Sequence, residues 1–230
     1  MCYAERVASR FSGPGMPYEG LAKITPSGPR WTGEVRLIEE HLEDPLRWKK
    51  PRRIFVNSMS DLFHEGLSDE QIDRVFAVMA RAPQHQYQVL TKRAERLPRY
   101  FARWALPLSD YPHMWIGVSC EDQKTADERI PFLLQTRAAV RFISAEPLLG
   151  PLDLAGLLAG IDWVIVGAES GPGRRPMKHA WAESIVAQCR SARVAVFIKQ
   201  LPRNGKVVHD MSLFPEGLRI QEFPEELPAR

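Results

Sequence analysis

Six continuous apolar runs recur between residues 53 and 201, and polar segments of helical character separate most of them. The runs are RIFVNS, YQVLTKR, MWIGVSCED, VRFISAEPL, DWVIVGAESG and AVFIKQL. The apolar residues of these runs are continuous rather than alternating, which is typical of parallel strands that are buried on both faces. Strands that alternate with helices in this way predict an α/β protein with a parallel sheet.

The segments between the runs predict the helices and the domain plan. Helical patterns cover residues 67–82, 94–104, 123–136 and 180–192. We expect a single barrel-like domain over residues 1–203. An irregular insertion at about 12–50 is expected inside it, because glycine and proline gather there. The proline- and acid-rich segment 204–230 is expected to be an irregular tail that packs on the domain through Phe214, Leu218, Ile220 and Phe223.

Nearly every apolar run ends in polar or charged residues. These are Asn57 to Asp61, Thr91 to Arg93, Ser119 to Glu121, Ser144 to Glu146, Glu169 to Gly171, and Lys199 with Gln200. An open doubly wound sheet concentrates its ligand groups at one switch point, whereas a barrel gathers groups from many strand ends into one mouth. The pattern therefore favours a parallel (β/α) barrel of the TIM type, complete or partial, over an open doubly wound sheet.

Composition narrows the class of protein only slightly. The chain has 230 residues, 44% of them hydrophobic, and a formal net charge of +3. Cys2, Cys120 and Cys189 are too few and too widely spaced for a disulfide framework, which predicts a cytoplasmic protein. No apolar stretch is long enough to predict a membrane span. The arginine-rich basic charge permits a nucleic-acid or phosphate partner without requiring one.

Two glutamates follow neighbouring apolar runs directly. Glu146 lies in SAEPLLGP and Glu169 lies in GAESGPG, so both are expected at the rim of the predicted barrel. At such a place they could bind a cation, an amine or sugar hydroxyls. The alternative is that they cap the following turns or form salt bridges with Lys92, Arg93 or Lys199.

Two other segments could carry chemistry. ESGPGRRPM places Arg174 and Arg175 after a glycine–proline turn, which could form an anion site or simply a tight turn. NSMSDLFHE holds Asp61, His64 and Glu65 in one turn, and these are possible metal ligands. A polar loop with one histidine is the alternative.

Long stretches of the chain resemble one protein family. Six strings carry the resemblance, in this order: PRRIFVNSMSDLFHE, YQVLTKR, WIGVSCEDQ, RIPFLLQTRAAVRFISAEPLLGP, IDWVIVGAESGPGRRPM and VFIKQL. They are similar to a phage-type family of bacterial and phage proteins of unknown function that has a three-cysteine motif. The match extends from residue 2 to the tail LRIQEFP, nearly the whole chain.

The resemblance gives the N-terminus a meaning. In that family the motif C-x6-C-x-x-C-Y-A-E is similar to the cysteine loop of radical S-adenosylmethionine (SAM) enzymes. CYAE, from Cys2 to Glu5, matches its last cysteine. The resemblance implies a [4Fe-4S] cluster and SAM as cofactors of a full-length form. It also implies that this chain is truncated, lacks two of the three cysteines and does not hold the full cluster.

The resemblance also assigns roles to the residues at the strand ends. Expected at the cofactor are Asn57, Ser58, Asp61, Ser119, Glu121, Ser144, Glu146, Glu169, Ser170 and Gly171. Expected at a substrate or anion are Lys92, Arg93, Arg174, Arg175, Lys199 and Gln200. Cys2 is the expected metal ligand.

Three functions remain open from the sequence. The first is a radical SAM-like iron–sulfur enzyme that acts on nucleic acid, with a nucleic acid or a co-encoded protein as its partner. The second is a metal-dependent hydrolase that uses Asp61, His64, Glu146 and Glu169. The third is a non-catalytic protein that binds nucleic acid or a partner protein.

Overall fold

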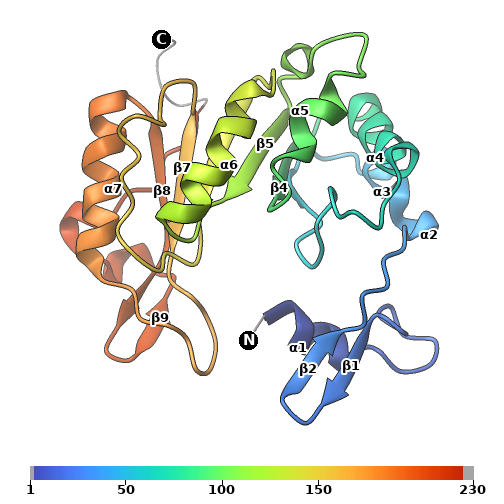
Figure 1. Cartoon of the computed structure of the whole chain (residues 1–230), viewed down its shortest axis with the longest axis horizontal. Coiled ribbons are helices and arrows are strands. Elements are labelled where there is room, and N and C mark those ends of the chain that lie inside the picture. Colours follow the sequence, from blue (N-terminus) through green and yellow to red (C-terminus); the bar gives the residue numbers. More distant parts are fainter. Residues whose placement is uncertain (1–2, 225–230) are drawn as a thin grey trace.

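The computed structural model describes residues 3–224 (Figure 1). The helices are α1 (Tyr3–Arg10), α2 (Glu39–Leu42), α3 (Asp44–Arg47), α4 (Asp69–Arg81), α5 (Arg96–Phe101), α6 (Gln123–Gln135) and α7 (His179–Ala192). The strands are β1 (Ala22–Thr25), β2 (Gly28–Trp31), β3 (Arg53–Val56), β4 (Gln86–Thr91), β5 (Met114–Ser119), β6 (Val140–Ala145), β7 (Trp163–Gly167), β8 (Ala195–Arg203) and β9 (Lys206–Val208). Three short 3₁₀ helices cover Leu108–Asp110, Met211–Leu213 and Glu216–Leu218.

Seven strands form the main sheet in the order in which they occur along the chain, from β3 to β9. The strands β3 to β8 pair in parallel, and they coincide with the six apolar runs. The prediction of six parallel strands is therefore confirmed. The last pair, β8 with β9, is antiparallel and forms a hairpin that the sequence pattern did not predict.

The predicted (β/α) barrel is wrong. The sheet curls like half a barrel, but β3 and β9 are its two edges and do not pair with each other. Closure requires the first and last strands to share hydrogen bonds. Here one edge strand has four residues and the other has three and runs antiparallel. The chain between β6 and β7, residues 146–162, also contains no helix, so the βα repeat is broken and the class is mixed α/β.

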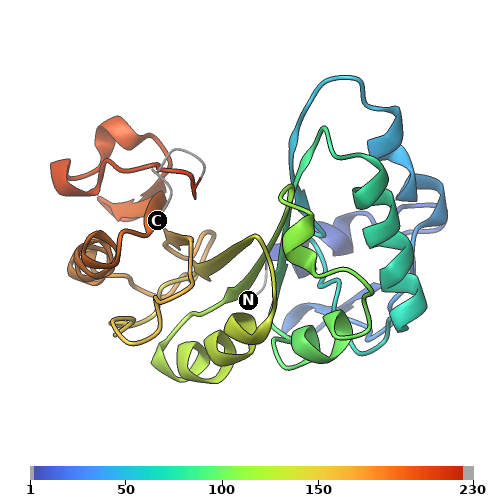
Figure 2. The same cartoon turned by 90° about the horizontal axis from the view of Figure 1, so that it is seen from above.

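Helices cover the outer face of the curled sheet, as the view from above shows (Figure 2). Helix α4 is typical: Ser68 caps its N-terminus, and Ile72, Phe76 and Met79 turn one apolar face toward the sheet. These positions recur every three or four residues, the spacing of one helix face. The outer face therefore holds the larger hydrophobic core.

The inner face of the sheet has its own aromatic cluster. Trp115, Phe142 and Trp163 lie on three adjacent strands and are all buried. The ring of Phe142 lies against Gly117 of the neighbouring strand, where a Cβ would collide with it. A large side chain thus fills the space that a glycine leaves, so the inner face is close-packed around this cluster.

The C-terminal tail packs against the curled sheet at the end where the parallel strands begin. Phe223 packs against Trp163 and Phe197, with ring centroids 5.3 Å apart in both pairs. The guanidinium of Arg53, on the opposite edge strand, lies 3.8 Å from the centroid of the Phe223 ring. Phe214 is also buried in the outer core. Apolar residues of the tail therefore pack on the domain.

Residues 3–36 form a separate small unit instead of the irregular insertion that glycine and proline indicated. Helix α1 packs on the antiparallel hairpin of β1 and β2, and Arg30 forms an ion pair with Glu5 at 3.6 Å. The unit lies beyond the carboxyl ends of the main strands (Figure 1). Arg6 of α1 reaches the loop after β7, next to Gly171.

Within residues 3–224, no helix combines the length and the apolar character that a bilayer span needs.

Candidate functional site

Buried polar residues gather at one edge of the sheet. Seven polar or charged residues are buried among those described, and five of them lie at the level where the parallel strands end: Thr91, Ser119, Glu121, Ser144, and Gln200, which pairs with the last residue of β7. Burying a polar group costs free energy unless it is hydrogen-bonded, so such a concentration needs an explanation. We call this edge, formed by the carboxyl ends of β3 to β8, the mouth.

Neighbouring strands end in the same way at the mouth. Ser119 of β5 and Ser144 of β6 are register partners and therefore share a face. Each serine is followed two positions later by a glutamate, Glu121 or Glu146. Side chains alternate along a strand, so Trp115 and Ser119 belong to the inner face. The buried serines of the mouth thus lie on the same face as the aromatic cluster, nearer to the carboxyl ends of the strands.

Glu121 is held by two cations. Lys92, from the end of β4, forms a short ion pair with it, and Arg129 of α6 donates to its other oxygen at 2.9 Å. Arg129 also donates to the carbonyl of Ser119 at 2.6 Å. Burial alone would raise the pKa of Glu121, but the hydrogen bond and charge of Lys92, together with Arg129, outweigh it and lower that pKa. Glu121 is therefore a carboxylate at neutral pH.

Glu146 has the second arrangement of this kind. Lys199 of β8 lies 3.2 Å from one carboxylate oxygen, and the Ser144 hydroxyl donates to the other at 3.2 Å. The carboxylate occupies the space next to Gly167 of β7, where a Cβ would collide with it. Glycine is thus required at the end of β7 for this placement of Glu146.

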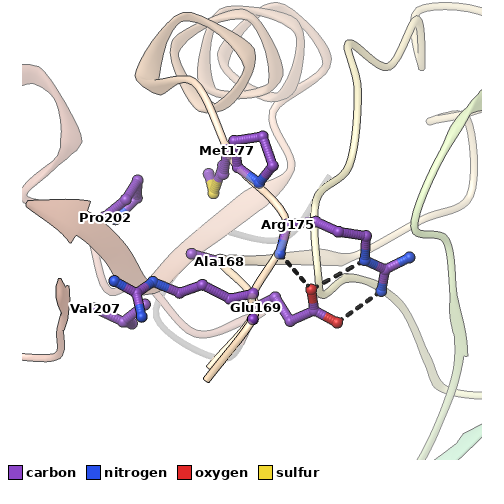
Figure 3. Close-up of a pocket in the computed structure, with 9 residues that line it drawn as sticks. Ala168, Glu169, Arg175, Met177, Pro202 and Val207 are labelled. Atoms are coloured by element: carbon purple, nitrogen blue, oxygen red, sulfur yellow. Dashed lines mark hydrogen bonds and ion pairs between the residues drawn. The ribbon is translucent and has the colours of Figure 1, made fainter. Parts of the chain in front are cut away.

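Glu169 has the third arrangement (Figure 3). Arg175 binds it through its backbone N–H at 2.7 Å and through two guanidinium nitrogens, Nε at 2.9 Å and Nη2 at 2.7 Å. These hydrogen bonds lower the pKa of Glu169 to about 2. The hydrogen bond and charge of Glu169 raise the pKa of Arg175, and the charge of Glu121 adds to this.

In each of the three ion pairs the carboxylate is mostly buried and the cation is about half exposed. The side chains of Glu121, Glu146 and Glu169 are 11, 16 and 17% exposed. Their partners Lys92, Lys199 and Arg175 are 54, 54 and 56% exposed. The carboxylates are therefore fixed in the wall of the mouth, whereas each cation lies half in solvent and can turn away from its carboxylate.

Asp61 serves a different purpose from the one expected. It accepts four hydrogen bonds, from Thr91 Oγ1 at 2.7 Å, Lys92 N at 2.9 Å, Phe63 N at 3.0 Å and Arg93 Nη1 at 3.2 Å. All of its lone pairs are thus engaged in joining the loop after β3 to the end of β4. Asp61 therefore holds the loop after β3 to the end of β4, and its oxygen atoms are not free to bind a cofactor or metal.

The loop after β3 holds other expected residues at the surface. Asn57 adopts a positive φ of 58° and donates to Ser60 at 2.9 Å, and Ser58 beside it is exposed. His64 accepts from the N–H of Gly66 at 3.0 Å and lies 3.6 Å from Glu65. Across residues 3–224, no group of three or more His, Cys, Asp and Glu side chains could hold a metal ion.

A cavity of about 370 Å³ lies behind the loop that follows β7 (Figure 3). Ala168, Met177, Pro202 and Val207 give it an apolar wall. Arg174 lines it too, but its guanidinium donates to the carbonyls of Gly171, at 3.3 Å, and Gly205. Since Arg174 binds carbonyls and Arg175 binds Glu169, the two guanidinium groups do not converge on one anion.

The other expected residues near β7 and β8 have structural contacts. Gln200 is buried and donates to the carbonyl of Ala168, which ties β8 to β7. Ser170 and Gly171 lie in the loop that continues to Arg174. Sequence reasoning missed Arg129. The only sequence signal for Arg129 was its place two helical turns after Glu121.

The residues described do not fit an iron–sulfur cluster. Such a cluster needs three thiolates from neighbouring cysteines. Within residues 3–224 the cysteines are Cys120, after β5, and Cys189, in α7, and both are buried. Burial raises the pKa of each thiol to about 12, so both stay protonated. Cys2, the expected metal ligand, lies outside the described residues.

Replacing Arg175 by glutamine is expected to raise the pKa of Glu169 from about 2 toward its ordinary value of 4.5. A lowered carboxyl pKa stabilises the fold above about pH 4.5, and this contribution disappears as the pH falls toward 2. Because Arg175 is half exposed, solvent screening limits the contribution to about 1 kcal/mol. Carbon NMR titration of the side-chain carboxyl measures the pKa directly. Arg174→Gln is the control and should leave it unchanged; an unchanged pKa in Arg175→Gln would contradict the assignment.

One comparison with known proteins gave a match. A family model described as "Protein of unknown function (DUF5131)" matches residues 1–212. This match supports the resemblance to a family of unknown function. It gives no evidence of a phage origin or of radical SAM character. No curated protein and no solved structure matches the chain.

Proposed function

The chain belongs to the DUF5131 family of proteins of unknown function, and we propose that it is a SAM-dependent enzyme whose ligand binds in the mouth. The resemblance to radical SAM enzymes predicted that the ligand binds at the strand ends. The observation that supports the proposal is the set of three ion pairs at these strand ends. The proposal uses no step on an iron–sulfur cluster, because residues 3–224 hold no ligand set for one.

The chemistry of SAM fits fixed carboxylates with movable cations. SAM carries an ammonium group, a sulfonium and two ribose hydroxyls, all of which a carboxylate can bind. When Lys199 turns into solvent, an ammonium or a hydroxyl pair of the ligand takes its place on Glu146. The exchange leaves no buried charge without a partner, which is the outcome that would be costly.

The alternative of a metal-dependent hydrolase is less well supported. Its four expected ligands were Asp61, His64, Glu146 and Glu169. Asp61 is fully hydrogen-bonded, and Glu146 and Glu169 are each held by a separate cation. A metal would have to displace all of these partners and draw together side chains that form no cluster within residues 3–224.

Isothermal titration calorimetry with SAM tests the proposal. We expect saturable binding to the wild-type chain and about tenfold weaker binding to Glu146→Gln, since a hydrogen bond to a charged group contributes about 1.5–3 kcal/mol. Glu128→Gln is the matched control, because Glu128 pairs with Lys124 on the exposed side of α6. Absence of binding at millimolar SAM, or equal affinity of both variants, would reject the proposal.

A further inference from the structure

Exposed cations precede the free edge of the sheet. Lys49, Lys50 and Arg52 are all exposed in the stretch that leads into β3. Within residues 3–224, none of the three forms an ion pair with a carboxylate. The guanidinium of Arg52 lies 4.4 Å from the centroid of the Trp48 ring, which in turn packs edge-on against the buried His85. The cationic stretch is therefore anchored rather than loose.

An exposed aromatic ring follows these cations on β3. Phe55 is 44% exposed although it lies within a strand. It pairs in register with Gln88, which pairs with Trp115, so Phe55 belongs to the inner face of the sheet. The strand β3 is an edge of the sheet, and its outer side forms no strand pair among the described residues.

Along the edge strand the cations come first, then the ring, then the mouth; Arg52 and Phe55 project to opposite sides of the strand, so a ligand that contacts both passes around this edge. A strand rises about 3.3 Å per residue, so the chain extends ~16 Å from Arg52 to Asn57. Phe55 lies between them, and Asn57 begins the loop that borders the mouth. A ligand that follows β3 from the cationic stretch would therefore arrive at Lys92 and Glu121.

We propose that β3 binds single-stranded nucleic acid, with Lys49, Lys50 and Arg52 on the phosphates and Phe55 stacked on a base. Proteins that bind single strands combine a basic track with aromatic rings, because every base has a flat face to stack on. In a duplex the bases are already stacked and cannot cover Phe55. The charges select a polyanion, and the ring selects one with unpaired bases. This binding does not depend on the ligand proposed for the mouth.

Fluorescence anisotropy at several potassium chloride concentrations tests the assignment. The probe is a fluorescein-labelled oligothymidylate about 12 nucleotides long. In the double variant Lys49→Gln, Lys50→Gln, we expect the slope of log affinity against log salt to fall by about 1.4, or about 0.7 for each phosphate contact. Phe55→Ala is expected to weaken binding about tenfold with an unchanged slope, since stacking releases no counterions.

A matched pair of substitutions serves as the control. Lys124→Gln with Arg137→Gln removes two exposed cations at the ends of α6 and should change neither affinity nor slope. The inference is overturned if both double variants lose the same slope. It is also overturned if Phe55→Ala is neutral, or if polyglutamate or duplex DNA competes as well as the single strand. SAM titrations of the same variants keep the two proposals separate, because Lys49→Gln, Lys50→Gln should bind SAM like the wild type.

Discussion

Replacing Trp163 by alanine is expected to lower the free energy of unfolding by about 3–5 kcal/mol. Trp163 is 3% exposed and lies at the centre of the inner aromatic cluster. Its ring contacts four others, those of Trp115, Phe142, Phe197 and Phe223. Its indole N–H donates to the carbonyl of Glu222 at 2.9 Å. Alanine would leave a cavity in the inner face and detach the tail as well.

Urea denaturation of both proteins measures this loss. Trp181→Ala is the control, because Trp181 is only partly buried on α7 and its loss should cost about 1 kcal/mol. Phe223→Ala tests the role of the tail. If Phe223 stabilises the fold through Trp163, the two substitutions together should cost less than the sum of the single losses. Additive losses, or equal losses for Trp163 and Trp181, would refute this account of the inner face.

The strands were predictable because their signal is local. A run such as WVIVG is apolar throughout, which is typical of a strand that is buried on both faces. Closure of the sheet has no local signal. Whether β3 meets the last strand depends on sheet curvature and on the direction of β9, and β9 is only three residues long. The polar strand ends that suggested a barrel are equally compatible with the open edge of a half-barrel.

The candidate site was predictable in place but only partly in pairing: the salt bridge of Glu146 with Lys199 was one of the alternatives, whereas the other pairs were not expected. Carboxyl ends of parallel strands share one edge, so Glu121, Glu146 and Lys92 were expected together, and Lys92 does bind Glu121. The identity of each partner depends on geometry beyond the strands. Arg129 reaches Glu121 only because of how α6 is rotated on the sheet. Asp61 was expected at a ligand, but two backbone N–H groups and the side chains of Thr91 and Arg93 donate to its oxygen atoms.

Replacing Gly167 by alanine is expected to weaken SAM binding more than tenfold, if the mouth is the ligand site. The new Cβ would collide with the Glu146 carboxylate, which would then leave both the Ser144 hydroxyl and Lys199. Forcing a methyl into a close-packed place typically costs about 1–3 kcal/mol. One substitution would thus misplace a carboxylate and a cation together, whereas Glu146→Gln removes only a charge.

A double-mutant cycle separates this effect from general damage to the fold. In the background of Glu146→Ala the collision is absent, so adding Gly167→Ala should change neither SAM affinity nor the free energy of unfolding. Gly150→Ala is the control in the same β6–β7 connection, because no atom lies within 4 Å of the Cβ it would add. If Gly167→Ala weakened binding equally with and without Glu146, the glycine would act through the backbone of β7 and not by making room for the carboxylate. If it left binding intact in the wild-type background, Glu146 would not touch the ligand.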